Sequence, residues 1–377
     1  MPEVKFEEIS PADFFYRNRD IAGFSSPSRS LYMSIRELVE NSLDACEVGR
    51  ILPNIIVELS SEGNSDEGVD IYKLRIEDNG IGVSAEHIPK AFATVFYGSK
   101  YGYKQSRGTF GLGGTMALLY GQITTNKPAT VISSKGGREV HKFVLMIDIV
   151  KNEPKIFEHK VLKNEKKWHG TIVEFYLEGD YTNSKAKIIQ YFNHTAIANP
   201  HASIMFIDPR GRLYYYPRAT TKIPEPPQES LPHPVGVDVE TMSRLLATTR
   251  ERTMLTFLMK SFQRVGEKSA RDVLKLAGID EGKNPKKLSH DEVTRLVDAI
   301  KKYGRFRMPD PSSLSPIGRD LLETGIKNML NPEFLYIVER PPASYSGYPF
   351  IVEVGLAYGG SIPASDTVQL YRFANKI

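Results

Sequence analysis

A carboxylate, an amide and a second carboxylate, those of Glu37, Asn41 and Asp44, follow one another at offsets of four and then three residues. In an α-helix these offsets stack side chains on one face, so the three groups would converge on one small volume. Such a group can orient a water molecule or supply oxygen ligands to a divalent cation. The same spacing also occurs on solvated helix faces, so it predicts a site only in combination with other motifs.

A further carboxylate, Asp78, ends an alternating stretch, 71–78, that predicts a β-strand. The alternation puts Asp78 on the same face as the apolar Leu74, so we expect its side chain to point inward. Gly80 and Gly82 follow, and glycine permits a positive φ or the close approach of a flat ligand. Asp-Asn-Gly is also typical of a hairpin turn. An inward carboxylate beside two glycines suits a pocket that accepts the exocyclic amine of adenine.

A glycine-rich stretch, 107–119, reads Arg-Gly-Thr-Phe-Gly-Leu-Gly-Gly-Thr-Met-Ala-Leu-Leu and leads into a predicted helix. A helix N-terminus offers unpaired backbone N–H groups and the positive end of the helix dipole, and both favour phosphate. Ser99 and Lys100 precede the stretch and could add a hydroxyl and a positive charge. The glycine spacing matches neither a P-loop nor a dinucleotide-binding turn, so this motif is weak evidence alone.

Periodicity predicts the elements that must position these residues. Ser26 suits the N-cap of a helix over 26–45, and Pro27 suits its first position. Strands are predicted near 54–59, 71–78, 131–132, 143–147 and 170–175. Together these elements predict an α+β layer, with a mixed, mainly antiparallel sheet and helices on one face.

Composition limits the class of protein. The chain has 377 residues, of which 41% are hydrophobic, which is enough for two or three domains. Its net charge of +4 permits a nucleic-acid partner without requiring one. A single cysteine, Cys46, excludes an internal disulfide and favours an intracellular protein. With no signal sequence and no apolar run near the roughly 20 residues of a membrane span, we expect a cytoplasmic protein without a membrane partner.

The proline-rich stretch 222–234 is expected to be stiff and extended, and it marks a domain boundary. Beyond it, residues 257–278 predict two helices on either side of a glycine turn. Arg264, Lys268 and Arg271 lie near that turn. A basic turn of this kind can contact nucleic-acid phosphates, but it can equally be a packing spacer.

The order of the motifs carries a family resemblance. The helix motif, then Asp78-Asn79-Gly80-Ile81-Gly82, then 108–113 and later Gly170-Thr171 resemble the four motifs of the ATPases shared by gyrase, heat-shock chaperones, histidine kinases and mismatch-repair proteins. Over essentially its whole length the chain is most similar to the B subunits of archaeal-type DNA topoisomerase VI, notably in residues 36–45, 97–101 and 222–234. The segment after the prolines resembles the helix-two-turns-helix module of some ribosomal proteins and DNA glycosylases.

The resemblance implies three domains. Residues 1–225 would form a Bergerat-type ATPase sandwich with an N-terminal strap, and residues 226–306 a small helix-two-turns-helix domain. Residues 307–377 would form the N-terminal part of an α/β transducer domain, which the resemblance implies is truncated. In the family that domain continues and contributes a lysine to the ATP γ-phosphate. No such lysine can be assigned here, so either the chain is a fragment or its coupling is impaired.

The resemblance also implies roles for individual residues. Glu37 would be the general base that polarises the attacking water, Asn41 would hold Mg²⁺, and Asp78 would read adenine, with Asp44 in a supporting position. The other implied ATP contacts are Gly80, Gly82, Ser99, Lys100, Gly108, Thr109, Phe110, Gly111, Leu112, Gly113, Gly114, Thr115 and Thr171. Thr115 departs from the family pattern, in which a lysine is common, but the backbone donors of the loop would remain.

The function implied is that of the ATP-binding and ATP-hydrolysing B subunit of a type II topoisomerase of the VI class, with ATP and Mg²⁺ as cofactors. ATP-dependent homodimerisation would gate the passage of a DNA duplex during relaxation and decatenation. A separate A subunit would cleave the DNA within an A2B2 heterotetramer associated with the nucleoid. The alternatives are another ATPase of the same group and a non-catalytic, nucleotide-sensing DNA-binding or scaffold module.

Overall fold

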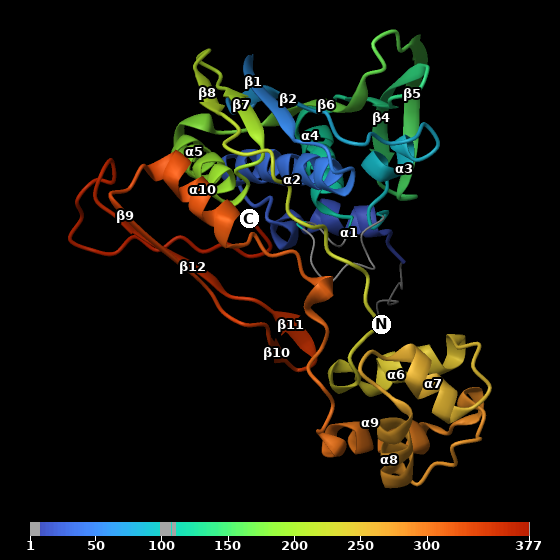
Figure 1. Cartoon of the computed structure of the whole chain (residues 1–377). Coiled ribbons are helices and arrows are strands. Elements are labelled where there is room, and N and C mark those ends of the chain that lie inside the picture. The colour runs from blue at the N-terminus through green and yellow to red at the C-terminus, as the bar shows by residue number, and fades with distance from the viewer. Residues whose placement is uncertain (1–7, 99–106, 108–110, 377) are drawn as a thin grey trace, which may run out of the picture.

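A computed structural model describes residues 8–98, 107 and 111–376 of the chain. The largest part of this described region is an eight-stranded sheet in the order β5-β4-β3-β6-β2-β1-β7-β8, at the top of Figure 1. Its strands are β1 (Asn54–Asn64), β2 (Asp70–Asp78), β3 (Ala129–Lys135), β4 (Glu139–Asp148), β5 (Glu153–Lys163), β6 (His169–Glu178), β7 (Ser203–Ile207) and β8 (Leu213–Tyr216). All neighbours are antiparallel except β1 and β7, which are parallel. The predicted mixed, mainly antiparallel sheet is confirmed.

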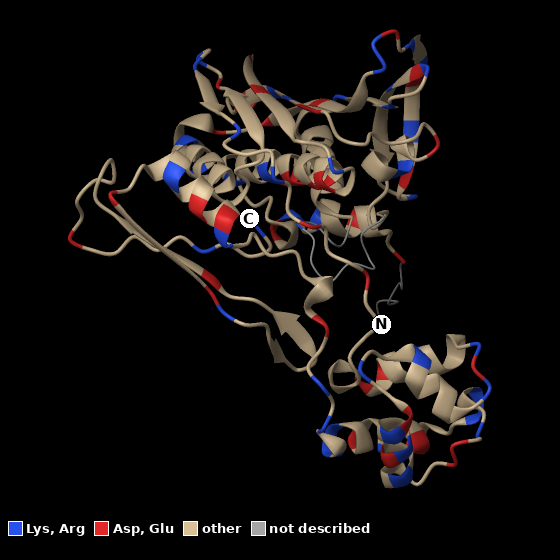
Figure 2. Cartoon of the chain, in the orientation of Figure 1, with Lys and Arg blue, Asp and Glu red and all other residues tan. Residues whose placement is uncertain are grey.

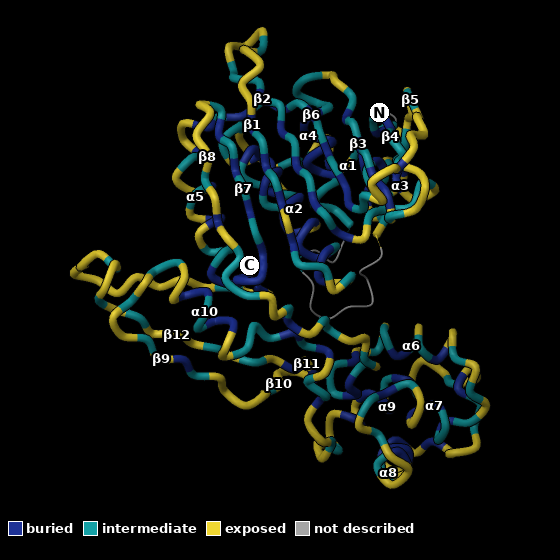
Figure 3. The backbone as a smooth tube through the Cα atoms, turned by 45° about the horizontal axis from the view of Figure 1, so that its top comes forward, coloured by how far each residue is buried: buried dark blue, intermediate teal, exposed yellow. Residues whose placement is uncertain are grey.

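Helices cover one face of this sheet, as predicted, and Figure 1 shows α2, α4 and α5 side by side beneath it. The helices of this part are α1 (Pro11–Arg17), α2 (Pro27–Val48), α3 (Ile88–Ala93), α4 (Gly113–Thr125) and α5 (Tyr181–Ala198). The inward faces of the strands and of these helices form one hydrophobic core. Figure 3 shows that the buried residues concentrate in this layer.

Helix α2 runs through the centre of the layer, and its N-cap, its first-turn proline and its apolar spacing favour a helix. Ser26 Oγ accepts a hydrogen bond from the Arg29 N–H at 3.3 Å, and proline occupies the first turn. Leu31, Ile35 and Leu38 are buried against the sheet at helical spacing. The predicted helix is therefore confirmed, and it continues to Val48.

A second hydrophobic core belongs to four helices, α6 (Val239–Thr248), α7 (Met254–Ser261), α8 (Glu267–Ala277) and α9 (His290–Tyr303). They lie apart from the sheet, at the lower right of Figure 1. Helices α7 and α8 flank the turn at Gly266, as predicted. Gly278 ends α8 with a φ of 66°, a left-handed conformation that favours glycine.

The last part of the chain contains α10 (Arg319–Leu330), the antiparallel pair β9 (Phe334–Glu339) and β12 (Glu353–Tyr358), and the hairpin β10 (Ala343–Tyr345) and β11 (Tyr348–Phe350). Helix α10 lies against α5. A Cβ atom added at Gly325 would lie 2.0 Å from the Ile197 carbonyl oxygen, so the two helices touch through their backbones. No helix in the described ranges is long and apolar enough to cross a membrane.

Candidate nucleotide-binding site

Asp78 ends β2 and points into the protein, as the alternation predicts, with 6% of the residue exposed. Its Oδ1 accepts hydrogen bonds from the Gly80 N–H at 2.8 Å and the Thr171 N–H at 3.2 Å, and its Oδ2 accepts one from Ser42 Oγ at 3.1 Å. Burial raises the pKa of Asp78 to about 6, although these donors favour the charged form. Asp78 is therefore a buried hydrogen-bond acceptor with a pKa above the usual range of an aspartate.

The two glycines after Asp78 are required by close packing of the turn. A Cβ atom at Gly80 would lie 2.8 Å from Ala45 Cβ, and one at Gly82, where φ is 65°, would lie 2.0 Å from the Ser134 carbonyl oxygen. His169 Nδ1 donates a hydrogen bond to the Gly80 carbonyl oxygen at 2.9 Å, which fixes the turn from β6. Packing alone therefore explains these glycines, and the case for an adenine pocket depends on Asp78.

The first turn of α4 lies directly against α2. A Cβ atom at Gly113 would be 1.7 Å from Glu37 Oε2, and one at Gly114 would be 3.1 Å from Asn41 Nδ2. Glu37 is half-buried and Asn41 is exposed. The N-terminal end of α4, which is the positive end of its dipole, therefore lies beside a carboxylate and an amide.

Asp44 shares the helix face of Glu37 and Asn41 but has a different partner. It is buried, and its Oδ1 accepts a hydrogen bond from Arg107 Nη1 at 2.6 Å. The structure thus brings two of the three polar groups of the helix motif to α4 and commits the third to an ion pair.

Two serines support the site, and the sequence motifs did not identify them. Ser42 joins α2 to Asp78. Ser133 Oγ donates to the Gly170 carbonyl oxygen at 2.8 Å, accepts from the Val83 N–H at 2.8 Å and lies 3.0 Å from Thr171 Oγ1. The sequence offered one signal for Ser133, a polar residue at an inward strand position. That position indicates a role in the site only once the partners Val83 and Gly170 are known.

The remaining predicted ATP contacts divide into two groups. Ser99, Lys100, Gly108, Thr109 and Phe110 lie outside the described residues. The second group lies within the described residues near the start of α4. There Gly111 has a φ of 61°, and a Cβ atom added to it would lie 2.7 Å from the Tyr97 carbonyl oxygen, so a larger residue would not fit. Leu112 is the N-cap of α4, and Thr115, at 3% exposure, is buried in its first turn.

The predicted DNA-contacting cations lie at the turn between α7 and α8. Arg264 Nη2 is 2.9 Å from Asp310 Oδ2, and Arg271 is paired with Glu267 at 2.8 Å. Lys268 is exposed. Figure 2 shows acidic residues interspersed with the basic ones on these helices. Neighbouring carboxylates thus partly neutralise this turn, and DNA contact stays a prediction.

A magnesium site built from protein carboxylates is not found in the part of the chain that the structure describes, where no group of three or more His, Cys, Asp or Glu could hold a metal. The exposed Asn41 amide beside α4 can give one neutral oxygen. This suits an ion held mainly by the phosphates of a nucleotide and by water.

Comparison with known proteins identifies the class first. Residues 27–151 match the family "Histidine kinase-, DNA gyrase B-, and HSP90-like ATPase", and residues 309–377 match "Topoisomerase VI B subunit, transducer". The fold and the first of these matches define an ATPase of the class shared by gyrase, heat-shock chaperones and histidine kinases. The match to this class covers the part of the layer from α2 to β4.

The particular family follows from the curated relatives. The B subunit of type 2 DNA topoisomerase 6 from Metallosphaera sedula is 46% identical over 375 residues, which are 99% of this chain and 70% of that protein. Its counterpart from Saccharolobus islandicus matches at 46% identity over the same length. A solved topoisomerase IV ATP-binding domain of Francisella tularensis is 12% identical, covers 86% of this chain and 98% of that chain, and gives a TM-score of 0.39. The chain belongs to the family of type 2 DNA topoisomerase 6 B subunits, and the resemblance seen in the sequence is confirmed.

Proposed function

We propose that one ATP molecule binds between α2, the end of β2 and the start of α4, and that Glu37 directs its hydrolysis. One observation carries this proposal. Ser42 of α2 bonds Asp78 at 3.1 Å, while Glu37 and Asn41 of the same helix lie against the first two residues of α4. Three motifs that are distant in sequence therefore meet at α2.

Asp78 is proposed to recognise adenine by accepting a hydrogen bond from its exocyclic amine. Its buried Oδ2 accepts one hydrogen bond from Ser42, and a carboxylate oxygen can accept a second, here from the exocyclic amine. Guanine carries a carbonyl group at the equivalent position, and two acceptors would face each other. The site would therefore prefer adenine to guanine. Thr171, whose N–H already bonds Asp78, is proposed to border the base on the side of β6.

Glu37 and Asn41 are proposed to act at the phosphate end. The half-buried Glu37 carboxylate would orient a water molecule and take up its proton as the water attacks phosphorus. Asn41 would give an oxygen ligand to Mg²⁺, which neutralises phosphate charge when bound. The backbone N–H groups at Gly113, Gly114 and Thr115 would bind phosphate oxygens. Because the Thr115 side chain is buried, its contribution is assigned to the backbone.

Measurement of nucleotide affinity tests this proposal. The wild-type chain should bind an ATP analogue in the presence of Mg²⁺ and bind the matched GTP analogue more weakly. Asp78→Asn should weaken ATP binding, whereas Asp66→Asn, at an exposed position between β1 and β2, should not. Equal affinity for the two nucleotides, or unchanged binding by Asp78→Asn, would contradict the assignment of the base pocket.

We further propose that the chain acts with a topoisomerase VI A subunit in an A2B2 complex. Residues 1–225, 226–306 and 307–377 would serve as ATPase, helix-two-turns-helix and transducer parts. ATP-dependent dimerisation of the chain would gate the passage of a DNA duplex. The family assignment supports this role, and it would place the protein on the nucleoid in the cytoplasm. Decatenation by the reconstituted complex, dependent on ATP and on Glu37, is the test.

A DNA contact at the α7–α8 turn forms part of the same proposal. Lys268 is its main candidate, because Arg264 and Arg271 are already paired with carboxylates. Lys268→Ala should weaken duplex binding for all sequences alike and reduce its salt dependence. Unchanged DNA affinity at several salt concentrations would assign this turn to packing.

A further inference from the structure

A group of buried charged residues lies at the last two turns of α2, on the C-terminal side of Glu37 and Asn41. The side chain of Arg107 is 3% exposed, and its guanidinium contacts both Asp44 and Glu47. Nη2 and Nη1 of Arg107 donate to the two carboxylate oxygens of Glu47 at 2.7 and 3.1 Å. This two-bond geometry fixes the direction of the guanidinium as well as its position.

Two other parts of the chain reach the same carboxylate. His201 Nε2 donates to Glu47 Oε1 at 3.1 Å, and Lys376 Nζ lies 3.5 Å from Glu47 Oε2. Asn199 Oδ1 accepts from Arg107 Nη2 at 2.6 Å, and Asn199 Nδ2 donates to the Lys376 carbonyl oxygen at 3.3 Å. Glu47 is therefore the common partner of Arg107 and Lys376. We call the connected residues the Glu47 cluster, and they are Asp44, Glu47, Arg107, Asn199, His201 and Lys376.

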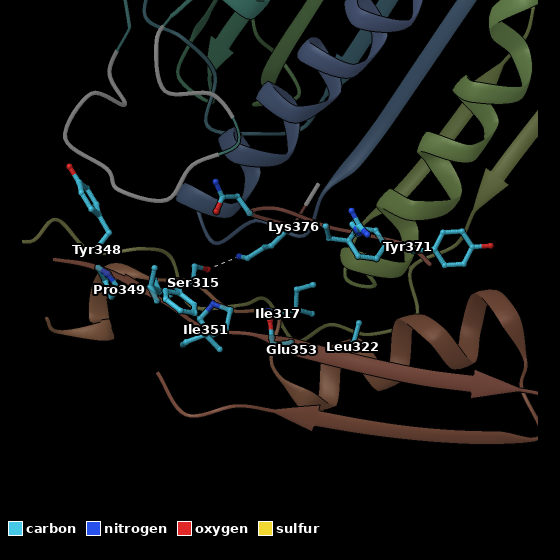
Figure 4. A pocket seen from close by; sticks show the side chains of 15 residues that line it. Ser315, Ile317, Leu322, Tyr348, Pro349, Ile351, Glu353, Tyr371 and Lys376 are labelled. Atoms are coloured by element: carbon cyan, nitrogen blue, oxygen red, sulfur yellow. Dashed lines mark hydrogen bonds between the residues drawn. The ribbon is translucent and has the colours of Figure 1, made fainter. Parts of the chain in front are cut away.

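Lys376 is 6% exposed although it lies near the C-terminal end of the chain. Its Nζ donates a hydrogen bond to Ser315 Oγ at 2.5 Å, drawn as a dashed line in Figure 4. A cavity of about 470 Å³ lies beside it, bordered by Ile317, Tyr348 and Glu353 among others (Figure 4). The Lys376 ammonium is therefore held by two polar partners, Ser315 and Glu47, at the edge of this cavity.

The charges of the Glu47 cluster balance within a small volume. Two carboxylates, Asp44 and Glu47, face two cations, Arg107 and Lys376. Burial by itself would raise the pKa of Glu47, but Arg107, with help from His201 and Lys376, holds that pKa well below its usual range. Loss of one partner would leave a buried charge uncompensated, so the members of the cluster depend on one another.

The positions of the two cations in the chain give the cluster its interest. Arg107 is the first residue of the glycine-rich stretch 107–119, in which Gly113 and Gly114 lie against Glu37 and Asn41. Lys376 belongs to residues 309–377, which match the transducer family. Glu47 thus lies on α2, the helix that also carries Glu37, the proposed general base. Its carboxylate contacts one cation from each of these two segments.

We propose that Glu47 is a positioning residue that couples ATP binding to the placement of the transducer segment. Arg107 lies six residues before the first residue of α4 in the sequence, so nucleotide bound at the start of α4 would favour the Arg107 position seen here, and Arg107 and Lys376 share Glu47. By linkage, the Lys376 contact should favour nucleotide binding to the same extent that nucleotide favours the contact. This inference depends on the proposed ATP site.

The test compares nucleotide affinity in matched variants of the full chain. Lys376→Met removes the ammonium and keeps most of the stem, and Lys376→Arg restores a cation. The control is Lys327→Met, which breaks the exposed Lys327–Glu323 pair in the same C-terminal part. With an unhydrolysable ATP analogue and Mg²⁺, Lys376→Met should bind about fivefold to 100-fold more weakly, with partial recovery in Lys376→Arg and no change in Lys327→Met. A loss smaller than about fivefold in Lys376→Met overturns the proposal.

Hydrogen exchange gives a second readout that a merely structural lysine would not alter. In the wild type, the ATP analogue should slow amide exchange in residues 371–376, and this nucleotide-dependent difference should vanish in Lys376→Met. Circular dichroism checks that the variants fold. If Lys376→Met does not fold, Arg107→Lys carries the same test, because it removes the two-bond contact with Glu47. No change in exchange on nucleotide binding by the wild type overturns the coupling. Failure of the wild type to bind the analogue would instead contradict the proposed ATP site.

Discussion

Ser42 Oγ donates a hydrogen bond to Asp78 Oδ2 at 3.1 Å, and this contact joins the central helix to the end of the second strand. Five residues before Ser42 in the same helix, Glu37 lies against Gly113. Helix α2 therefore contacts a hydrogen-bond acceptor, Asp78, through Ser42 and the N-terminus of α4 through Glu37. That arrangement suits a nucleotide, which carries an amine on its base and negative charge on its phosphates.

Asp78→Asn should weaken ATP binding about ten- to 100-fold, because a hydrogen bond to a charged acceptor is replaced by a weaker neutral one. Isothermal titration with an unhydrolysable analogue measures this loss. Asp66→Asn provides the matched control at an exposed position.

Glu37→Ala should retain nucleotide binding and lose hydrolysis, with a fall in turnover of about 10² to 10⁴. The expected separation of binding from turnover follows from the position of Glu37 at the phosphate end of the proposed site. Single-turnover hydrolysis by the reconstituted complex measures it. A normal rate of hydrolysis in Glu37→Ala would show that another group activates the water.

ATP affinity should fall as the pH is lowered through about 6, the pKa to which burial raises Asp78. Above that pH Asp78 is a carboxylate and accepts from adenine; below it, the protonated form has lost charge and one acceptor position. Since the nucleotide phosphates also titrate, the informative quantity is the difference between the pH profiles of wild type and Asp78→Asn. Parallel profiles would rule out Asp78 as the titrating group.

The same raised pKa of Asp78 predicts the sign of a stability effect. Its stabilising contribution is complete below the pKa of the unfolded chain, about 3.9, and is lost as pH rises through the folded value of about 6. Between these values the wild type should therefore lose stability with rising pH relative to Asp78→Asn. Urea unfolding of both proteins at several pH values measures the difference, and an opposite trend would contradict the assigned shift.

Gly113→Ala should reduce hydrolysis about 100-fold, because the added methyl group would lie 1.7 Å from Glu37 Oε2 and must displace that carboxylate. Gly137→Ala is the control, since a Cβ atom there meets nothing within 4 Å. Turnover equal to that of the control variant would mean that Glu37 has another working position.

Glu47→Gln should destabilise the fold by about 3–5 kcal/mol, because it leaves Arg107 and Lys376 short of a buried counter-charge. The exposed pair broken by Glu323→Gln should matter far less, about 0–1 kcal/mol. Denaturant midpoints compare the two. A similar small effect in both variants would show that water or other groups compensate the charges of Arg107 and Lys376 when Glu47 is replaced.

Local sequence signals predicted the elements of the site because each depends on near neighbours. The cap and apolar spacing of α2 lie within that helix, and the inward direction of Asp78 follows from strand alternation. The partner of Asp44 could not be predicted, since Arg107 is 63 residues away. For the same reason the support from Ser133 escaped prediction, because its partners lie on two other segments.

A structure of the chain with an unhydrolysable ATP analogue and Mg²⁺ tests the central claim most directly. The account predicts the adenine amine within hydrogen-bond distance of Asp78 Oδ2 and phosphate oxygens at the N–H groups of Gly113 and Gly114, with Glu37 facing the terminal phosphate. A nucleotide that reaches only one of these groups, or binds away from α2, would contradict the account.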